Sequence, residues 1–130
     1  MPWPSEPVWI GEAETLALHD RLLALDGGPS GVRSLDLLRS ALARPRQHLA
    51  YGEAVEPAML AALYTAGIVR NHAFVDGNKR TGFVVGVLFL ELNGWTFIAN
   101  EAEATQAVLA LAAGQMDEHA YAAFLTANMK

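Results

Sequence analysis

Residues 79–92 read KRTGFVVGVLFLEL, and the length and apolar character of this stretch decide the fold. From Gly82 to Leu90 the run is apolar nearly all round, so a helix here belongs inside a core. Its β-branched residues leave a buried strand as the competing interpretation. We favour a helix over Lys79–Leu92, because the segment is long and ends at Asn93-Gly94, a good helix C-cap. The sequence therefore predicts an all-α domain packed round this central apolar helix.

Apolar residues at helical spacing, together with capping residues, predict further helices on both sides of this segment, about six in all. Pro45 is expected to end the second of them, because the residue before a proline disfavours the helical conformation. Residues 44–56 are therefore expected to be irregular. The predicted helices are Glu12–Leu25, Leu35–Ala43, Pro57–Asn71, Lys79–Leu92, one from 101 to 113 and one from Glu118 to Asn128, with Ser34, Asn100 and Asp117 as N-caps.

Very little sheet is expected. Val8–Ile10 and Trp95–Ala99 are the candidate strands, and at most they form one very short pair. Three prolines make residues 1–11 an extended N-terminal segment. Residues 1–130 contain no repeat and no long linker, so they are predicted to form a single domain.

Composition excludes several classes of protein. The 130-residue chain is 52% hydrophobic and 18% charged, which excludes intrinsic disorder. Because it contains no cysteine, disulfides, thiolate metal sites and cysteine nucleophiles are excluded, and a reducing cytoplasm is the expected location. A formal net charge of −5 argues against a broad electrostatic grip on nucleic acid or on an anionic membrane. We expect no signal peptide, and the apolar runs fall short of the ~18–20 residues that span a bilayer.

Residues 71–81, NHAFVDGNKRT, gather most of the residues that could carry chemistry. They lead into the N-terminus of the predicted central helix, where unpaired N–H groups and about half a positive charge attract anions. Lys79 and Arg80 are unfavourable at such an end by roughly 0.3–1 kcal/mol each, and a polyanionic ligand would remove that conflict. Gly77 lets the backbone approach a ligand closely, and Asn78 adds an amide.

Two further side chains complete the parts of a phosphate-transfer site. Asp76 is a hard oxygen ligand, and one carboxylate plus substrate phosphates is a common way to hold Mg²⁺. A neutral imidazole can accept a proton from an alcohol at neutral pH, so His72 is a candidate general base. Each of these residues alone is more often a cap or a solvated group, and Phe74 is a core residue. Their combination within nine residues favours a functional site.

Residues 72–80, HAFVDGNKR, resemble the signature of the Fic/Doc family in its Doc (death-on-curing) form. The Fic form reads H-P-F-x-[D/E]-G-N-G-R, and the Doc form has N-K-R in place of N-G-R. The similarity includes Gly31-Val32-Arg33 and Phe89–Gly94, and covers roughly residues 12–128. Ala73 stands where many members have proline. We find no inhibitory Ser/Thr-x-x-x-Glu-Gly/Asn element of the kind some Fic proteins carry, so control is expected from outside.

The resemblance implies an all-α Fic fold and a toxin of a type II toxin–antitoxin system. It implies a protein kinase that uses ATP and Mg²⁺ to phosphorylate a threonine of elongation factor Tu, which inhibits translation. The implied partner is a Phd-type antitoxin. We expect this chain to make no direct contact with nucleic acid or with a membrane. Carried over by position, His72 is the general base, Asp76 holds Mg²⁺, and Gly77, Asn78, Lys79 and Arg80 bind the phosphates.

Two other functions remain open: a Fic-type AMP transferase acting on a protein hydroxyl, and a catalytically inactive helical interaction protein. A metal phosphohydrolase is disfavoured, because the His19-Asp20 doublet lacks the preceding histidine that such enzymes need. We expect His19 to be partly buried on the first helix. Arg33, Arg44 and Arg46 are candidates for ligand or target contacts, and Gly82 and Gly86 are expected to permit close helix packing.

Overall fold

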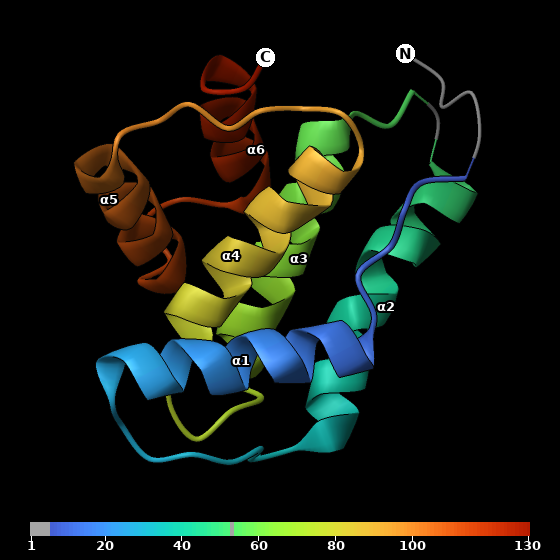
Figure 1. Cartoon of the computed structure of the whole chain (residues 1–130). Helices are drawn as coiled ribbons and strands as arrows, with labels where there is room; N and C mark the ends of the chain where they lie inside the picture. The colour runs from blue at the N-terminus through green and yellow to red at the C-terminus, as the bar shows by residue number, and fades with distance from the viewer. Residues whose placement is uncertain (1–5, 53) are drawn as a thin grey trace.

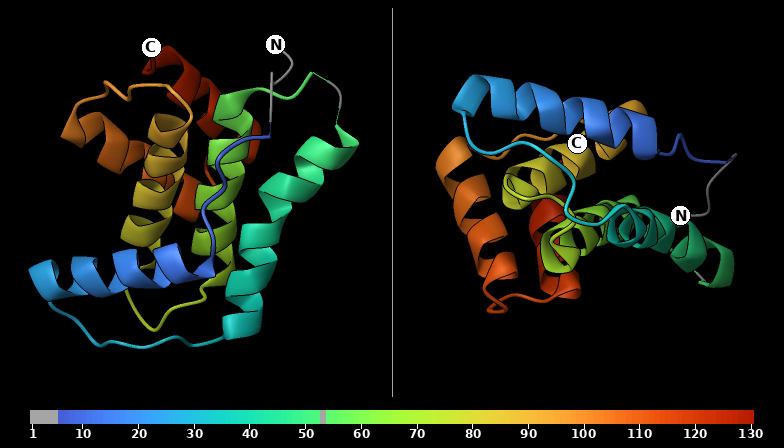
Figure 2. Two further views of the ribbon diagram at one scale, coloured as in Figure 1. Left: turned by 45° about the vertical axis from the view of Figure 1, so that its right-hand side comes forward. Right: turned by 90° about the horizontal axis from the view of Figure 1, so that it is seen from below.

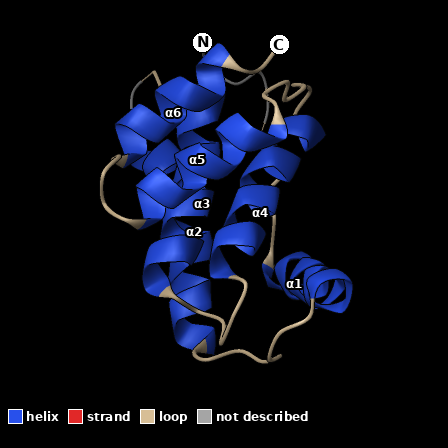
Figure 3. Ribbon diagram, turned by 90° about the vertical axis from the view of Figure 1, so that its left-hand side faces the viewer, coloured by secondary structure: helices blue, strands red, loops and turns tan. Residues whose placement is uncertain are grey.

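The structure is a computed structural model that describes residues 6–52 and 54–130. Loops alone connect its helices (Figure 3), and the described residues contain no strand, only two isolated bridges. None of the helices in these residues is long and apolar enough to cross a bilayer. The predicted all-α fold is confirmed. Within the described residues the helices number six: α1 (Glu12–Asp26), α2 (Leu35–Tyr51), α3 (Pro57–Asn71), α4 (Asn78–Leu92), α5 (Glu101–Ala112) and α6 (Glu118–Ala127).

The most completely buried helix is α3, not α4 as the sequence analysis expected. Twelve of its fifteen residues are buried, and it packs against α2, α4 and α6 (Figure 1). By contrast, Val84, Val87 and Leu88 of α4 keep partial exposure. The small side chains of the alanine-rich α3 allow other helices to pack on several of its sides. An apolar run such as that of α4 does not determine how many helices surround it.

Two glycines on α4 bring it close to α3. A Cβ atom at Gly86 would clash with the Thr65 Oγ1 and would lie 3.0 Å from the Ala61 carbonyl oxygen, which is closer than most real contacts. The same Thr65 hydroxyl donates a hydrogen bond of 2.8 Å to the Gly82 carbonyl. The expected role of Gly82 and Gly86 in close packing is therefore confirmed.

Helix α2 continues through Pro45 to Tyr51, so the predicted end at Ala43 and the irregular segment after it are wrong. A proline inside a helix costs about 3 kcal/mol, because it removes a hydrogen bond and crowds the preceding turn. Here Pro45 is itself buried, and Leu49 one turn later packs against the core. Burial of this face outweighs the local cost.

The predicted pairing of Val8–Ile10 with Trp95–Ala99 is also wrong. Residues 95–99 instead lie beside the C-terminal residues, where Thr96 exchanges two hydrogen bonds with Lys130, of 2.7 and 3.0 Å. The Val8 N–H donates to the Asn93 side chain. Short polar attachments of this kind have no periodic signal in the sequence. The three predicted N-caps, Ser34, Asn100 and Asp117, are confirmed by the hydrogen bonds that their side chains accept. Residues 1–5 of the predicted extended N-terminal segment lie outside the described residues.

Tyr121 of α6 makes the stability of the fold sensitive to alkaline pH. Burial raises the pKa of its hydroxyl to about 12, from an ordinary value near 10. Below pH 10 the folded and unfolded chains both keep this proton. Between pH 10 and 12 only the unfolded chain loses it, so we expect the free energy of unfolding to fall, by roughly 2 kcal/mol from this group.

Chemical denaturation of Tyr121→Phe between pH 8 and 12 checks this expectation. The variant should lose less stability than the wild-type protein over that range. Burial also raises the pKa of Tyr64, so a smaller fall should remain. Tyr51→Phe is the control, because Tyr51 is 90% exposed, and it should follow the wild-type curve. An unchanged pH dependence in Tyr121→Phe would contradict the assignment.

Candidate active site

The turn of residues 72–77 joins α3 to α4 at the end of the molecule that α1 crosses (Figure 2). The loop of residues 27–34, which connects α1 to α2, runs beside it. The Ala73 carbonyl accepts hydrogen bonds from the N–H groups of Arg33 and Ser34, at 2.8 and 3.0 Å. The loop that precedes α2 therefore supports the turn along its length.

Both ends of the turn adopt the left-handed backbone conformation. His72 ends α3 at φ 52° and ψ 50°, and its N–H donates to the Ile68 carbonyl at 3.2 Å. Gly77 precedes α4 at φ 79°. This conformation costs a non-glycine residue roughly 1–2 kcal/mol, so the surroundings must hold His72 in place.

Arg33 provides that support. Its Nε donates to the His72 carbonyl at 2.7 Å, and its second guanidinium nitrogen donates to the Asn71 carbonyl at 2.9 Å. These carbonyls lie at the C-terminus of α3, where a cation also interacts favourably with the helix dipole. The expectation that Arg33 contacts a ligand or target stays untested, but its guanidinium is already bound to the turn.

Asn78 closes the turn from inside. Its side-chain Oδ1 accepts the Phe74 N–H and its Nδ2 donates to the Phe74 carbonyl, both at 2.9 Å. Asn78 is 5% exposed and Phe74 is fully buried. The carboxamide therefore satisfies the two backbone groups that Phe74 would otherwise bury unpaired. The second Nδ2 hydrogen and the backbone N–H are the donors that Asn78 could offer a ligand.

His19 of α1 touches the turn from the other side, and it is more buried than the sequence analysis expected, at 2% exposure. Its ring is stacked on Phe74, with centroids 3.8 Å apart and an angle of 11° between the planes. Its Nε2 lies 2.8 Å from the Asp76 carbonyl oxygen. The His19-Asp20 doublet marks this residue only as part of a possible metal motif, and nothing in the sequence connects it to the turn.

The six predicted site residues line one cavity of about 510 Å³, which is in the range of small-molecule sites. The side chains of His72, Asp76 and Lys79 are exposed there. The structure therefore brings together every residue that the motif singled out. The lining consists of His72, Asp76, Gly77, Asn78, Lys79 and Arg80 from the turn and α4, with Leu23, Asp26, Gly27, Val69 and Ala112 from other elements.

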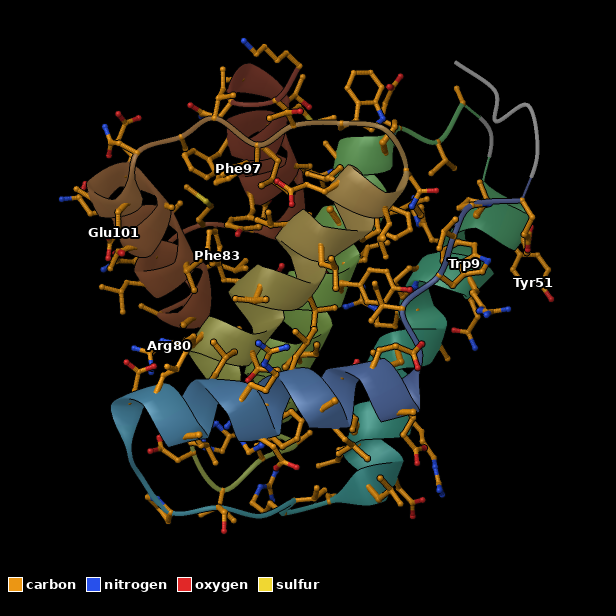
Figure 4. All side chains as sticks on the ribbon, viewed as in Figure 1. Trp9, Tyr51, Arg80, Phe83, Phe97 and Glu101 are labelled. Carbon is orange, nitrogen blue, oxygen red and sulfur yellow. The ribbon has the colours of Figure 1, made fainter. Side chains whose placement is uncertain are left out.

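The charges that line this cavity balance when His72 is neutral: Asp26 and Asp76 against Lys79 and Arg80. Arg80 forms an ion pair with Asp26, which keeps its guanidinium beside the C-terminal end of α1 (Figure 4). Exposed pairs of this kind are worth about 0–1 kcal/mol, so a phosphate could replace the carboxylate. No group of three or more metal-binding side chains occurs among the residues the structure describes. A cation at Asp76 would therefore need ligand atoms from a bound substrate.

Arg44 and Arg46, the two other candidates for ligand or target contacts, are not among the residues that line the cavity. Arg44 and Arg70 both pair with Glu118, at 2.9 and 3.0 Å, and so connect α2 and α3 to α6. The Arg46 guanidinium stacks over the Trp9 ring, 5.2 Å from its centroid. These contacts join elements of the fold, and the expectation that Arg44 or Arg46 contacts a ligand or target stays untested.

Comparison with known proteins decides the family. A family model described as "Fic/DOC family" matches residues 9–90. The chain belongs to the Fic/DOC family. Among its relatives, "Protein kinase doc" of Escherichia phage P1 is 33% identical over 85 residues, which are 65% of this chain and 68% of that protein. "Toxin Doc" of Mycolicibacterium smegmatis is 44% identical over 70 residues, 52% of this chain. That match spans only 53% of the mycobacterial protein.

Asn78→Asp tests how this Fic/DOC protein holds its turn. The carboxylate removes the donor to the Phe74 carbonyl and buries a charge beside that oxygen, so we expect a loss of about 2 kcal/mol in the free energy of unfolding. Thermal unfolding measures it. Asn128→Asp is the control, because Asn128 makes a similar bond to the Phe124 carbonyl at a half-buried position, and it should lose less. Equal stability of Asn78→Asp and the wild type would contradict this role.

Proposed function

We propose that this chain is the toxin of a toxin–antitoxin pair and acts as a protein kinase. Its substrates are ATP and elongation factor Tu, and the acceptor is a threonine hydroxyl. The observation that carries the proposal is the single cavity at the N-terminus of α4 that all six residues of the Doc-type motif line. The names of the two relatives, a protein kinase and a toxin, point the same way.

The cavity offers donors for the phosphates of a nucleotide. The first N–H groups of a helix lack partners within that helix, and those of α4 follow directly after Gly77, its N-cap. Lys79 and Arg80 add two cations at the same place, where they are unfavourable without an anion. Lys79 also replaces the glycine of the Fic form. A long cationic side chain at this position suits a nucleotide bound with its γ-phosphate presented to the acceptor hydroxyl.

Asp76 is the residue that would hold Mg²⁺, together with oxygen atoms of the bound phosphates. A carboxylate shared with substrate oxygens fits the preference of this ion, and the described residues offer no complete protein cage for it. When bound, Mg²⁺ neutralises charge on the phosphates and aligns them. Because the cavity charges otherwise balance, we expect tight nucleotide binding only when the cation is present.

His72 is the proposed general base. Its left-handed backbone and the Arg33 bonds fix its position at the end of α3, and its side chain is exposed along the cavity. The imidazole accepts the proton of the threonine hydroxyl as its oxygen forms a bond to the γ-phosphorus. The bond from the γ-phosphorus to the bridging oxygen breaks, and ADP leaves with that electron pair.

Control of such a toxin is proposed to come from a Phd-type antitoxin. We find no Fic-type inhibitory element in this sequence. A partner that covers the exposed cavity would block transfer.

Transfer from γ-labelled ATP to elongation factor Tu, with Mg²⁺, tests the proposal. We expect His72→Ala to lower the transfer rate about 10²–10⁴-fold, the usual contribution of a general base, with nucleotide affinity nearly unchanged. His48→Ala is the control, since His48 is exposed on α2 outside the cavity. Wild-type transfer by His72→Ala would refute the assignment. Mass spectrometry of the product separates the reactions, because a gain of AMP would favour the alternative AMP transferase.

Asp76→Asn tests the proposed cation site separately. Loss of the carboxylate should weaken ATP binding in the presence of Mg²⁺ and have little effect without it. Calorimetric titration of ATP with and without Mg²⁺ measures both affinities. Asp36→Asn is the control, because Asp36 is exposed in the first turn of α2 and does not line the cavity. An unchanged response of Asp76→Asn to Mg²⁺ would place the ion elsewhere.

A further inference from the structure

The imidazole of His19 is buried against the turn but does not line the cavity. A buried polar ring costs free energy unless its nitrogens are hydrogen-bonded, so its position calls for a reason. Its neighbour Asp20 is exposed, and the described residues contain no cluster of metal ligands around it. The contacts of His19 are instead with the turn itself.

The ring contacts Phe74 and Asp76 of the turn and lies beside Gly77. It is stacked on Phe74, and its Nε2 lies 2.8 Å from the Asp76 carbonyl oxygen. A Cβ atom placed on Gly77 would lie 3.6 Å from the same Nε2, an ordinary packing distance. Because a carbonyl can only accept, Nε2 must carry the hydrogen and donate it. The contacts of His19 lie at the Asp76 end of the turn, whereas Arg33 holds the His72 end.

Holding the Asp76 carbonyl has two consequences. It fixes the rotation of the backbone about Asp76, from which the side-chain carboxylate projects. It also fixes the next peptide plane, because the peptide bond is planar and trans. In such a plane the Gly77 N–H points opposite to the Asp76 carbonyl, and thus away from His19 at the start of α4.

We propose that His19 is a positioning residue that orients the Asp76 carboxylate and the Gly77 N–H, just before α4, toward the cation and phosphates. The inference rests on the proposed role of Asp76 in holding Mg²⁺. The hydrogen bond from Nε2 carries the effect, and the stack on Phe74 keeps the ring in register. Removal of a residue that orients a metal ligand by a hydrogen bond commonly lowers the metal affinity about 10–100-fold.

Two substitutions separate the bond from the stack. His19→Phe keeps an aromatic ring on Phe74 but removes the donor to the Asp76 carbonyl. His19→Gln removes the ring but places an amide N–H close to the position of Nε2. The measurement is ATP binding at increasing Mg²⁺ concentration, read by calorimetry. We expect His19→Phe to raise the Mg²⁺ concentration for half-maximal binding about tenfold, and His19→Gln to stay within about threefold of the wild type.

The outcomes distinguish this inference from the proposed function. Absence of Mg²⁺-dependent ATP binding in the wild-type protein would refute the proposed function itself. Wild-type binding with an unshifted Mg²⁺ response in His19→Phe would overturn the inference alone. Equal losses in His19→Phe and His19→Gln would assign the effect to packing and also overturn it. His48→Phe, at an exposed position on α2, should match the wild type.

A measurement on the wild-type protein tests the bond even if His19→Phe does not fold. Nitrogen NMR of the imidazole distinguishes the two neutral tautomers. We expect His19 as the Nε2–H form, with a slowly exchanging proton because the ring is buried. A ring protonated only on Nδ1 cannot donate to the Asp76 carbonyl, and that result would overturn the inference.

Discussion

The hydrogen bonds between the Asn78 carboxamide and the Phe74 backbone set the shape of the turn on which the site depends. The buried helix α3 and the helix α4 packed against it are joined by a turn of six residues, and the backbone in that turn cannot follow either helix. Phe74 enters the core completely, so its N–H and carbonyl need partners away from water. Asn78 supplies both, which leaves the polar side chains around Phe74 free for the cavity.

Support for the turn comes from segments far apart in the sequence. Arg33 binds the carbonyls at the end of α3, and His19 packs against the Asp76 end from α1. The turn joins two closely packed helices, because Gly82 and Gly86 let the backbones of α3 and α4 approach each other. A site built on such elements holds its groups more precisely than a free loop does, and the charges at its mouth remain balanced until a ligand arrives.

Much of this fold could be predicted from the sequence because its signals are local. Caps and helical spacing lie within a few residues, so the helices and N-caps followed from them. The continuation of α2 through Pro45 did not, because burial of that face outweighs the local cost of the proline. The dominance of α3 was missed for a related reason: alanine and glycine mark close approach by neighbours, not strong hydrophobicity.

The candidate site likewise has a part that the sequence predicts and a part that it does not. The six candidate residues lie within nine positions of the sequence, so one motif predicted that they form one site, and they line one cavity. The contact between His19 and Asp76 joins residues 57 positions apart, and no periodicity links them. The chemical role of each residue depends on a bound ligand, so these roles are expected from the motif and not from the fold.

The central claim is that the start of α4 binds the phosphates of a nucleotide. Backbone amide NMR of the wild-type protein, titrated with ATP and Mg²⁺, tests it most directly. The largest chemical-shift changes should fall on Gly77, Asn78, Lys79 and Arg80, with smaller changes at His72. Saturating nucleotide that leaves these amides unmoved, or moves only amides remote from the cavity, would contradict it.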